Sequence, residues 1–221
     1  MTRRLLAGLL AVAVLGACTG ATDSTVGEEP AAEVGAADPG EAAAGVMRAV
    51  IAGEPEAAAG LTALDQMPIV ALLEGMPVRE AVALDDAARR AVAANFWAGF
   101  GDRLDLPDDP TLVTVQRVRG IPVTGAFSEV VLAGAGTQGA TLVSRRDGGW
   151  QVDVLASFGP VLAGNLAQVV ESLEADPRPE AERMLDLIRD QRPSLMALRS
   201  RAGVSAEVRQ IVFSILSLLD E

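Results

Sequence analysis

The sequence changes its hydrophobic periodicity twice, and this change limits the folds that the chain can adopt. Four segments between residues 111 and 158 are rich in β-branched residues and are bounded by Gly, Pro and Asp, which is typical of sequential antiparallel strands. Apolar residues recur at helical spacing on both sides of this region. The predicted strands are residues 111–118, 121–133, 140–146 and 150–158. The pattern predicts an α+β fold in which N-terminal helices pack on a curved antiparallel sheet of about four strands, followed by a C-terminal helical extension.

The first predicted helix has a start signal at Asp38. Asp38 can act as the N-cap acceptor, Pro39 occupies the first helical position, and the Glu41 carboxylate can reach back to the cap. We therefore expect the folded domain to begin at residue 38. The apolar face of this helix would consist of Val46, Met47, Val50 and Ile51.

A second helix is predicted from Pro55 through Leu64, and another from Asp85 onward. The run 68–73 is apolar, but periodicity does not decide between helix and strand there. In the helix after Asp85, apolar residues recur every four positions and form one stripe, which we expect to cover the sheet. Such a stripe is usually core, although in a cone-shaped fold it could also line a cavity. The stripe consists of Ala88, Val92, Phe96 and Phe100, with Trp97 beside it.

Residues 147–149 (Asp-Gly-Gly) are predicted to form a hairpin turn between two strands, because glycine readily adopts positive φ. Alternation then places Trp150, Val152 and Val154 on one face and Gln151 and Asp153 on the other. We expect one face to be buried and the other to be solvated.

The helical period returns after residue 158. Helices are predicted over residues 161–173 and 180–191, and Pro193 either interrupts the second helix or starts the next. The last helix is apolar over more than one stripe, and Ile211, Ile215 and Leu219 are its candidate interaction face. This helix is therefore either buried on two sides or meets a partner, and burial is the favoured interpretation.

The N-terminus has the pattern of an export signal. Arg3 and Arg4 precede eleven apolar residues, 5–15, which are too few to span a membrane. Leu15-Gly16-Ala17-Cys18 resembles the lipobox of bacterial lipoproteins, and this resemblance implies cleavage before Cys18 and diacylglyceryl modification of its thiol. Since Cys18 is the only cysteine, it has no disulfide partner within the chain. The alternative is an ordinary secretory peptide with Cys18 as a free thiol.

These signals divide the chain into four parts. Residues 1–17 are the predicted signal peptide, and residues 18–37, rich in Ala, Gly, Glu and Thr without a period, are predicted to be a disordered tether. Residues 38–158 would form the α+β domain, and residues 159–221 a helical extension packed on it. The protein would be anchored to the cell membrane and face outside the cytoplasm.

The residue inventory excludes several reaction mechanisms. The chain contains no His, Lys or Tyr, so it cannot build Ser-His-Asp or Cys-His catalysis, Schiff bases on lysine, or histidine-ligated metal sites. Its net charge of −12 argues against nucleic-acid binding and against a polybasic attachment to anionic lipid. We expect no cofactor. An enzyme built from this chain would depend on carboxylates.

Residues 49–58 (AVIAGEPEAA), between two predicted helices, and residues 148–152 (GGWQV), in the predicted sheet, resemble the ketosteroid-isomerase-like cone fold found in small exported lipoproteins. The resemblance covers about residues 38–158. The chain departs from it by lacking a clear strand between the second and third helices and by adding residues 159–221. Catalysis does not carry over, because enzymes of that superfamily typically use Asp with Tyr or His. The resemblance implies a cone that holds an apolar ligand or packs a partner. Its candidate pocket-lining residues are Phe96, Trp97, Phe100, Phe127 and Trp150.

Three further motifs have a simpler structural interpretation. Residues 134–139 (GAGTQG) match the letters of the dinucleotide fingerprint, but a strand rather than a helix is predicted to follow, so we interpret them as a strand connection. Asp102, Asp105, Asp108 and Asp109 lack EF-hand spacing, and we interpret them as a solvated acidic turn rather than a metal site. The pairs Arg89-Arg90 and Arg145-Arg146 are interpreted as solvated surface.

The sequence therefore predicts a membrane-anchored, non-catalytic lipoprotein that binds a partner protein or a small apolar ligand outside the cytoplasm. The alternative is a carboxylate-based enzyme with a cone-shaped pocket, which would require a close pair of Asp or Glu side chains in a cleft. Cys18 is the predicted lipidation site, and no catalytic or metal-ligating residue is assigned.

Overall fold

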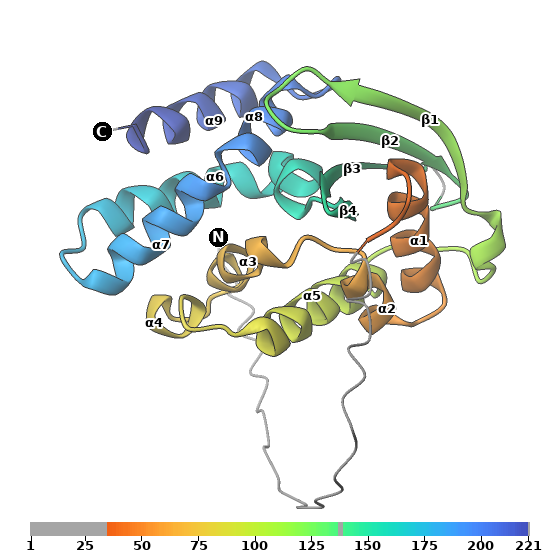
Figure 1. Cartoon of the computed structure of the whole chain (residues 1–221), viewed down its shortest axis with the longest axis horizontal. Helices are drawn as coiled ribbons and strands as arrows, with labels where there is room; N and C mark the ends of the chain where they lie inside the picture. The colour runs from red at the N-terminus through yellow and green to blue at the C-terminus, as the bar shows by residue number, and fades with distance from the viewer. Residues whose placement is uncertain (1–34, 137–138, 221) are drawn as a thin grey trace, which may run out of the picture. The chain divides into compact units, whose positions relative to one another are not determined.

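A computed structural model of the protein describes residues 35–136 and 139–220. The predicted signal peptide, Cys18 and most of the predicted tether lie outside these residues. The described residues belong to one compact unit that covers residues 33–221. This unit is α+β, with helices before and after a four-stranded sheet, as the sequence predicts (Figure 1).

The N-terminal helices begin where local start signals predict. The side chain of Asp38 accepts hydrogen bonds from the backbone N–H groups of Gly40 and Glu41. The side chain of Asp85 caps the longest helix of this region by accepting a hydrogen bond from the backbone N–H of Ala88. The apolar run 68–73 is helical. The elements are α1 (Pro39–Ile51), α2 (Pro55–Gly60), η1 (Leu64–Gln66), α3 (Met67–Leu73), α4 (Val78–Ala81), α5 (Asp86–Gly101) and η2 (Pro110–Leu112).

The sheet is a curved antiparallel meander with strand order β1-β2-β3-β4. Gly148, with φ of +74°, makes the tight turn between the last two strands, as predicted. The prediction of a strand over residues 150–158 is wrong beyond Val152, because Asp153 caps a helix there. The strands are β1 (Thr114–Ile121), β2 (Phe127–Ala133), β3 (Ala140–Asp147) and β4 (Gly149–Val152).

Helices cover both faces of the sheet at β3. One face packs against α1 and buries Val130 and Leu142 in the N-terminal core. The other face packs Phe127 and Val143 against the C-terminal extension. The prediction that one face of β4 is solvated is therefore wrong: Gln151 on that face is 7 % exposed. Edge strand β1 differs, because seven of its eight residues are exposed.

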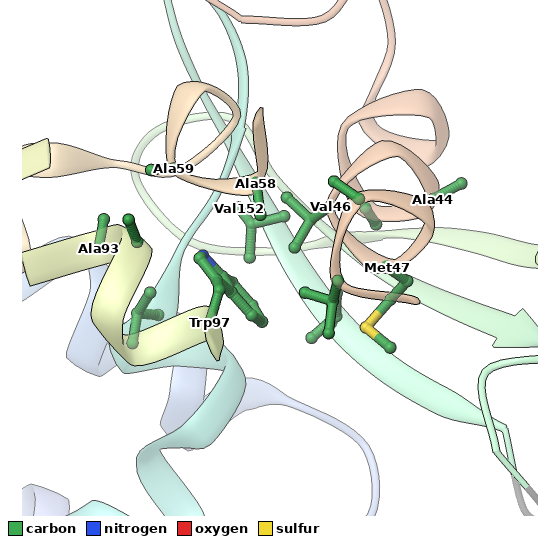
Figure 2. Close-up of a cluster of buried hydrophobic side chains, with 14 of the residues drawn as sticks. Ala44, Val46, Met47, Ala58, Ala59, Ala93, Trp97 and Val152 are labelled. Carbon is green, nitrogen blue, oxygen red and sulfur yellow. The ribbon is translucent and has the colours of Figure 1, made fainter. Parts of the chain in front are cut away.

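Helix α5 packs chiefly on α2, with further contacts to α1, α3 and η1, rather than directly on the sheet as predicted. The side chain of Trp97 on α5 is fully buried, whereas those of Phe96 and Phe100 are half-buried. Figure 2 shows Trp97 in the same cluster as Val152 of β4 and the α1 side chains Val46 and Met47. Trp97 thus links α5 to the sheet through a shared core.

The C-terminal extension consists of α6 (Val154–Glu174), α7 (Pro179–Asp190), α8 (Arg192–Ser200) and α9 (Ala206–Leu218). Pro193 lies in the first turn of α8, so it starts that helix. Helix α6 is the central element, since α7, α8 and α9 all contact it (Figure 1). Their second core includes Leu166, Met184 and Leu198.

Among the described residues, α6 is the one helix that is long and apolar enough to cross a membrane. Core helices of globular proteins have the same length and composition. Leu155, Ala163, Leu166 and Val170 of α6 are at most 2 % exposed, because they pack on its neighbours. This burial identifies α6 as the core helix of the extension.

Candidate functional site

Four aromatic rings from two helices meet at the end of α5. Phe96, Trp97 and Phe100 come from α5, and Phe158 comes from the start of α6. The ring centroids of Phe158 lie 5.3, 5.7 and 5.1 Å from those of Phe96, Trp97 and Phe100, and all contacts are edge-to-face. This geometry is favourable for aromatic pairs. We call these four residues the aromatic cluster.

The base of the aromatic cluster is closed. Trp97 is fully buried, and its indole Nε1 donates a 2.8 Å hydrogen bond to Oγ1 of Thr62. Thr62 in turn donates to the carbonyl oxygen of Ala58 at 2.8 Å. These bonds satisfy the polar atom of a buried aromatic residue. Trp97 therefore supports the site from beneath.

A pocket of about 410 Å³ lies beside the exposed side of this cluster. We call it the aromatic pocket. Most of its lining side chains are apolar, and they come from α5, the segment after α5, the β2–β3 connection, β3 and α6. The apolar lining residues are Phe100, Leu104, Leu106, Ala135, Ala140, Leu142 and Phe158. This volume and lining are typical of a site for a small organic ligand.

Few polar groups that line the aromatic pocket are available to bind or react with a ligand. The Ser157 hydroxyl accepts a 2.8 Å hydrogen bond from the backbone N–H of Val143 and donates to the Val143 carbonyl at 3.4 Å. It is therefore already engaged with β3. Asp105 is exposed and is the one carboxylate among the described lining residues. The lining thus lacks the carboxylate pair that the predicted alternative enzyme would need.

The structure separates the five predicted lining residues. Phe100 lines the aromatic pocket, and Phe96 and Trp97 support it. The prediction is wrong for Phe127, which lies on the other face of the sheet among residues of the extension. Trp150 is not among the residues that line this pocket; its backbone pairs with Ala36 beyond the edge of β4.

Sequence reasoning missed Phe158, because residues 150–158 were interpreted as a strand. In the structure, the helix that was predicted from Val161 begins at Val154 instead. The N-cap pattern at Asp153 was the available signal, since its side chain accepts from the backbone N–H of Ala156 at 2.7 Å.

The predicted interaction face on α9 is corrected by the burial of its residues. Ile215 is fully buried and Leu219 is 4 % exposed, because both belong to the second core. Ile211 is half-buried at the edge of that core. The exposed large apolar residue of α9 is instead Phe213.

A buried polar network joins the N-terminal half of the unit to the extension. The Gln66 side chain accepts from the backbone N–H groups of Val154 and Leu155 at 2.9 and 3.1 Å. It donates to Gln191 at 3.2 Å and to Ser194 at 3.1 Å. This single side chain therefore ties η1 to the start of α6 and to the α7–α8 junction.

Two aspartates lie on either side of Arg145 within this network. Asp65 accepts a hydrogen bond from Nη2 of Arg145, and an oxygen of Asp153 lies 4.0 Å from Nη1. Complete burial raises the pKa of Asp153, and this effect outweighs the opposing influence of Arg145 and Ser194. Burial also acts to raise the pKa of Asp65, but the hydrogen bond and charge of Arg145 hold that pKa below its usual range.

Arg145 was interpreted from the sequence as solvated surface, and that interpretation is wrong, because only 13 % of its side chain is exposed. Neither Asp65 nor Asp153 lines the aromatic pocket. Each of these three charged groups has a partner in the network. The arrangement is typical of a structural joint between two parts of a fold.

The remaining motifs have local roles. Asp109 of the acidic turn accepts from the backbone N–H and the hydroxyl of Thr111 at 2.9 and 2.7 Å. Within residues 35–136 and 139–220, no group of three or more His, Cys, Asp or Glu side chains could hold a metal ion. Strand β3 follows the glycine-rich segment, so the helix that a dinucleotide site requires is not at that position. Comparison of the chain with models of protein families, with curated protein sequences and with solved structures finds no match.

Proposed function

We propose that this protein is a lipid-anchored, extracytoplasmic binding protein whose aromatic pocket holds a small apolar ligand. The observation that carries the ligand proposal is the pocket of about 410 Å³ lined mainly by aromatic and aliphatic side chains. Burial of an apolar ligand there would be favourable because it removes apolar surface from water. The exposed carboxylate of Asp105 would lie near the ligand's solvated end.

The anchoring part of the proposal is supported by the N-terminal sequence. The segment Leu15-Gly16-Ala17-Cys18 follows a short apolar run and contains the only cysteine of the chain. Two acyl chains on Cys18 would suffice for stable attachment, whereas a single chain binds only marginally. Ligand binding would then take place at the outer surface of the cell membrane.

A ligand is better supported than a partner protein at the predicted face of α9, because Ile215 and Leu219 are buried in the core. A carboxylate enzyme is less well supported, because the close carboxylates Asp65 and Asp153 are held by Arg145 in a packed network. The resemblance to the ketosteroid-isomerase-like cone fold stays a prediction.

Binding of the neutral fluorescent probe N-phenyl-1-naphthylamine tests the ligand proposal. Ala140 lines the pocket and is half-buried, so Ala140→Phe should fill the cavity, whereas Ala140→Ser should leave it open. We expect the Phe variant to lose most of the probe binding and the Ser variant to retain it, with circular dichroism melts showing that both variants fold. Equal binding by both folded variants would rule out this pocket.

The intact mass of the protein purified from its membrane tests the anchor separately. Cleavage before Cys18 leaves 204 residues, since 221 minus 17 is 204, and the thiol adds the mass of a diacylglyceryl group. An unmodified Cys18 would contradict the anchor without affecting the ligand proposal.

A further inference from the structure

Helices α8 and α9 pack side by side in the extension (Figure 1). Residues of these two helices line a second hollow, far in sequence from the aromatic pocket. It has a volume of about 620 Å³ and is open to solvent. We call it the arginine groove. Its lining residues are Met196, Arg199, Ser200, Ala206, Arg209, Gln210 and Phe213.

The two arginines of the groove carry uncompensated charge. Within the described part of the chain, neither Arg199 nor Arg209 has a carboxylate within 4.0 Å, whereas the neighbouring Arg192 pairs with Asp220. Nη2 of Arg209 donates to the backbone carbonyl of Arg201 at 3.2 Å, which holds the side chain beside the groove. Both groove arginines are exposed and can therefore reach a ligand.

A third guanidinium lies behind the groove. Arg201 is 7 % exposed, and its Nη1 donates to the carbonyl oxygens of Ala156 and Ser157 at 2.7 and 2.6 Å. Its Nε is buried without a hydrogen-bond partner. Residues 196–213 contain three arginines and a single acidic residue, Glu207, in a chain of net charge −12. The carboxylate of Glu129 on β2 acts on the charge of Arg201, so the positive charge of the groove comes from Arg199 and Arg209, the two charged residues of its lining.

Apolar side chains lie directly beside these charges. Phe213 is 46 % exposed, and the guanidinium carbon of Arg199 lies 5.2 Å from its ring centroid. Met196 completes the apolar part of the lining. A free inorganic anion would contact the arginines and leave Phe213 and Met196 in water. A phosphate attached to an apolar group would contact both the arginines and these apolar side chains.

We propose that the arginine groove binds the phosphate headgroup of an anionic phospholipid at the membrane surface. This proposal rests on the membrane location in the proposed function, because an anchor on Cys18 would keep the groove close to lipid. Contact with the headgroups would give the tethered domain a defined orientation. The net negative charge of the chain argues against electrostatic attachment to anionic lipid. The fold nevertheless brings Arg199 and Arg209 together in one groove.

Vesicle binding by the full chain with Cys18→Ser tests the groove without lipid on the cysteine. The readout is the ratio of partition coefficients on vesicles containing phosphatidylglycerol and on pure phosphatidylcholine vesicles. Comparing this ratio between variants cancels the contribution of the N-terminal residues, including Arg3 and Arg4, because all variants share them. Because each arginine at an anionic surface contributes about 1 kcal/mol, Arg199→Gln with Arg209→Gln should lower the ratio roughly thirtyfold.

The matched control is Arg178→Gln with Arg183→Gln, which removes two exposed arginines from the region of α7. We expect its ratio to fall much less. Equal ratios for the two double variants would overturn the proposal. Binding of inorganic phosphate that is lost in Arg199→Gln with Arg209→Gln, together with an unchanged vesicle ratio in that variant, would identify a free-anion site and would also overturn it. These outcomes are independent of the Cys18 mass, so failure of the groove and failure of the anchor are distinguishable.

Discussion

The hydroxyl of Ser194 donates a 2.6 Å hydrogen bond to the fully buried carboxylate of Asp153. This bond connects the first turn of α8 to the N-cap of α6, across 41 residues of sequence. Ser194 also accepts from the Gln66 amide, which brings η1 to the same point. The contact therefore joins the sheet, the N-terminal helices and the extension.

Ser194→Ala should lower the free energy of unfolding by about 1–3 kcal/mol, because it leaves buried polar atoms of Asp153 and Gln66 without a partner. Urea unfolding at neutral pH measures the change. Ser214→Ala removes an exposed hydroxyl that bonds only within α9, so we expect a change within about 0.5 kcal/mol. Similar values for the two variants would show that the network does not hold the halves together.

Asp153→Asn should change how stability depends on pH. Because the folded state raises the pKa of Asp153, folding favours its protonated form, and the unfolded chain ionises first as pH rises. This contribution is fully present below the ordinary aspartate pKa of about 3.9 and is lost as pH rises through the folded value. The wild-type protein should therefore lose stability relative to Asp153→Asn over this window. Parallel urea titrations of the two proteins measure the difference, and a constant difference would contradict the raised pKa.

Two glycines of α6 should respond oppositely to alanine. A Cβ on Gly159 would lie 2.2 Å from Cδ2 of Leu198, so Gly159→Ala should destabilise by about 1–3 kcal/mol through overpacking against α8. A Cβ on Gly164 would meet no atom within 4 Å, so Gly164→Ala should stabilise by roughly 0.5–1 kcal/mol through helix propensity. Thermal melts of both variants test this packing. A stabilising effect at both positions would show that α8 does not approach α6 at this point.

Trp97 should report occupancy of the aromatic pocket. Its ring centroid lies 5.5 and 5.7 Å from those of Phe100 and Phe158, which line the pocket. In Trp150→Phe, Trp97 is the remaining tryptophan, and N-phenyl-1-naphthylamine should quench its emission as the probe binds. Ala140→Phe in the same background should remove the quenching. Quenching that persists in that variant would place the probe elsewhere.

Several elements could be predicted from the sequence because their signals are local. The side chains of Asp38 and Asp85 cap helices by accepting hydrogen bonds from backbone N–H groups two or three residues away. The positive φ of Gly148 makes the turn between β3 and β4. Strand β3 was predicted to within a residue for the same reason. The residues after Val152 were misassigned, because apolar alternation in a short run does not distinguish a strand from a buried helix start.

The sequence by itself determined the α+β order of elements, the helix starts and the limited catalytic inventory, because these depend on residues close together in the chain or on composition. Only the tertiary structure decided that Arg145 is buried, that Phe158 joins the α5 aromatic residues, and that Arg199 and Arg209 share one groove. The burial of Arg145 depends on Asp65 and Gln191, which are 80 and 46 residues away from it. A charged side chain can leave water only where distant parts of the chain supply its partners, and sequence periodicity does not show which parts meet.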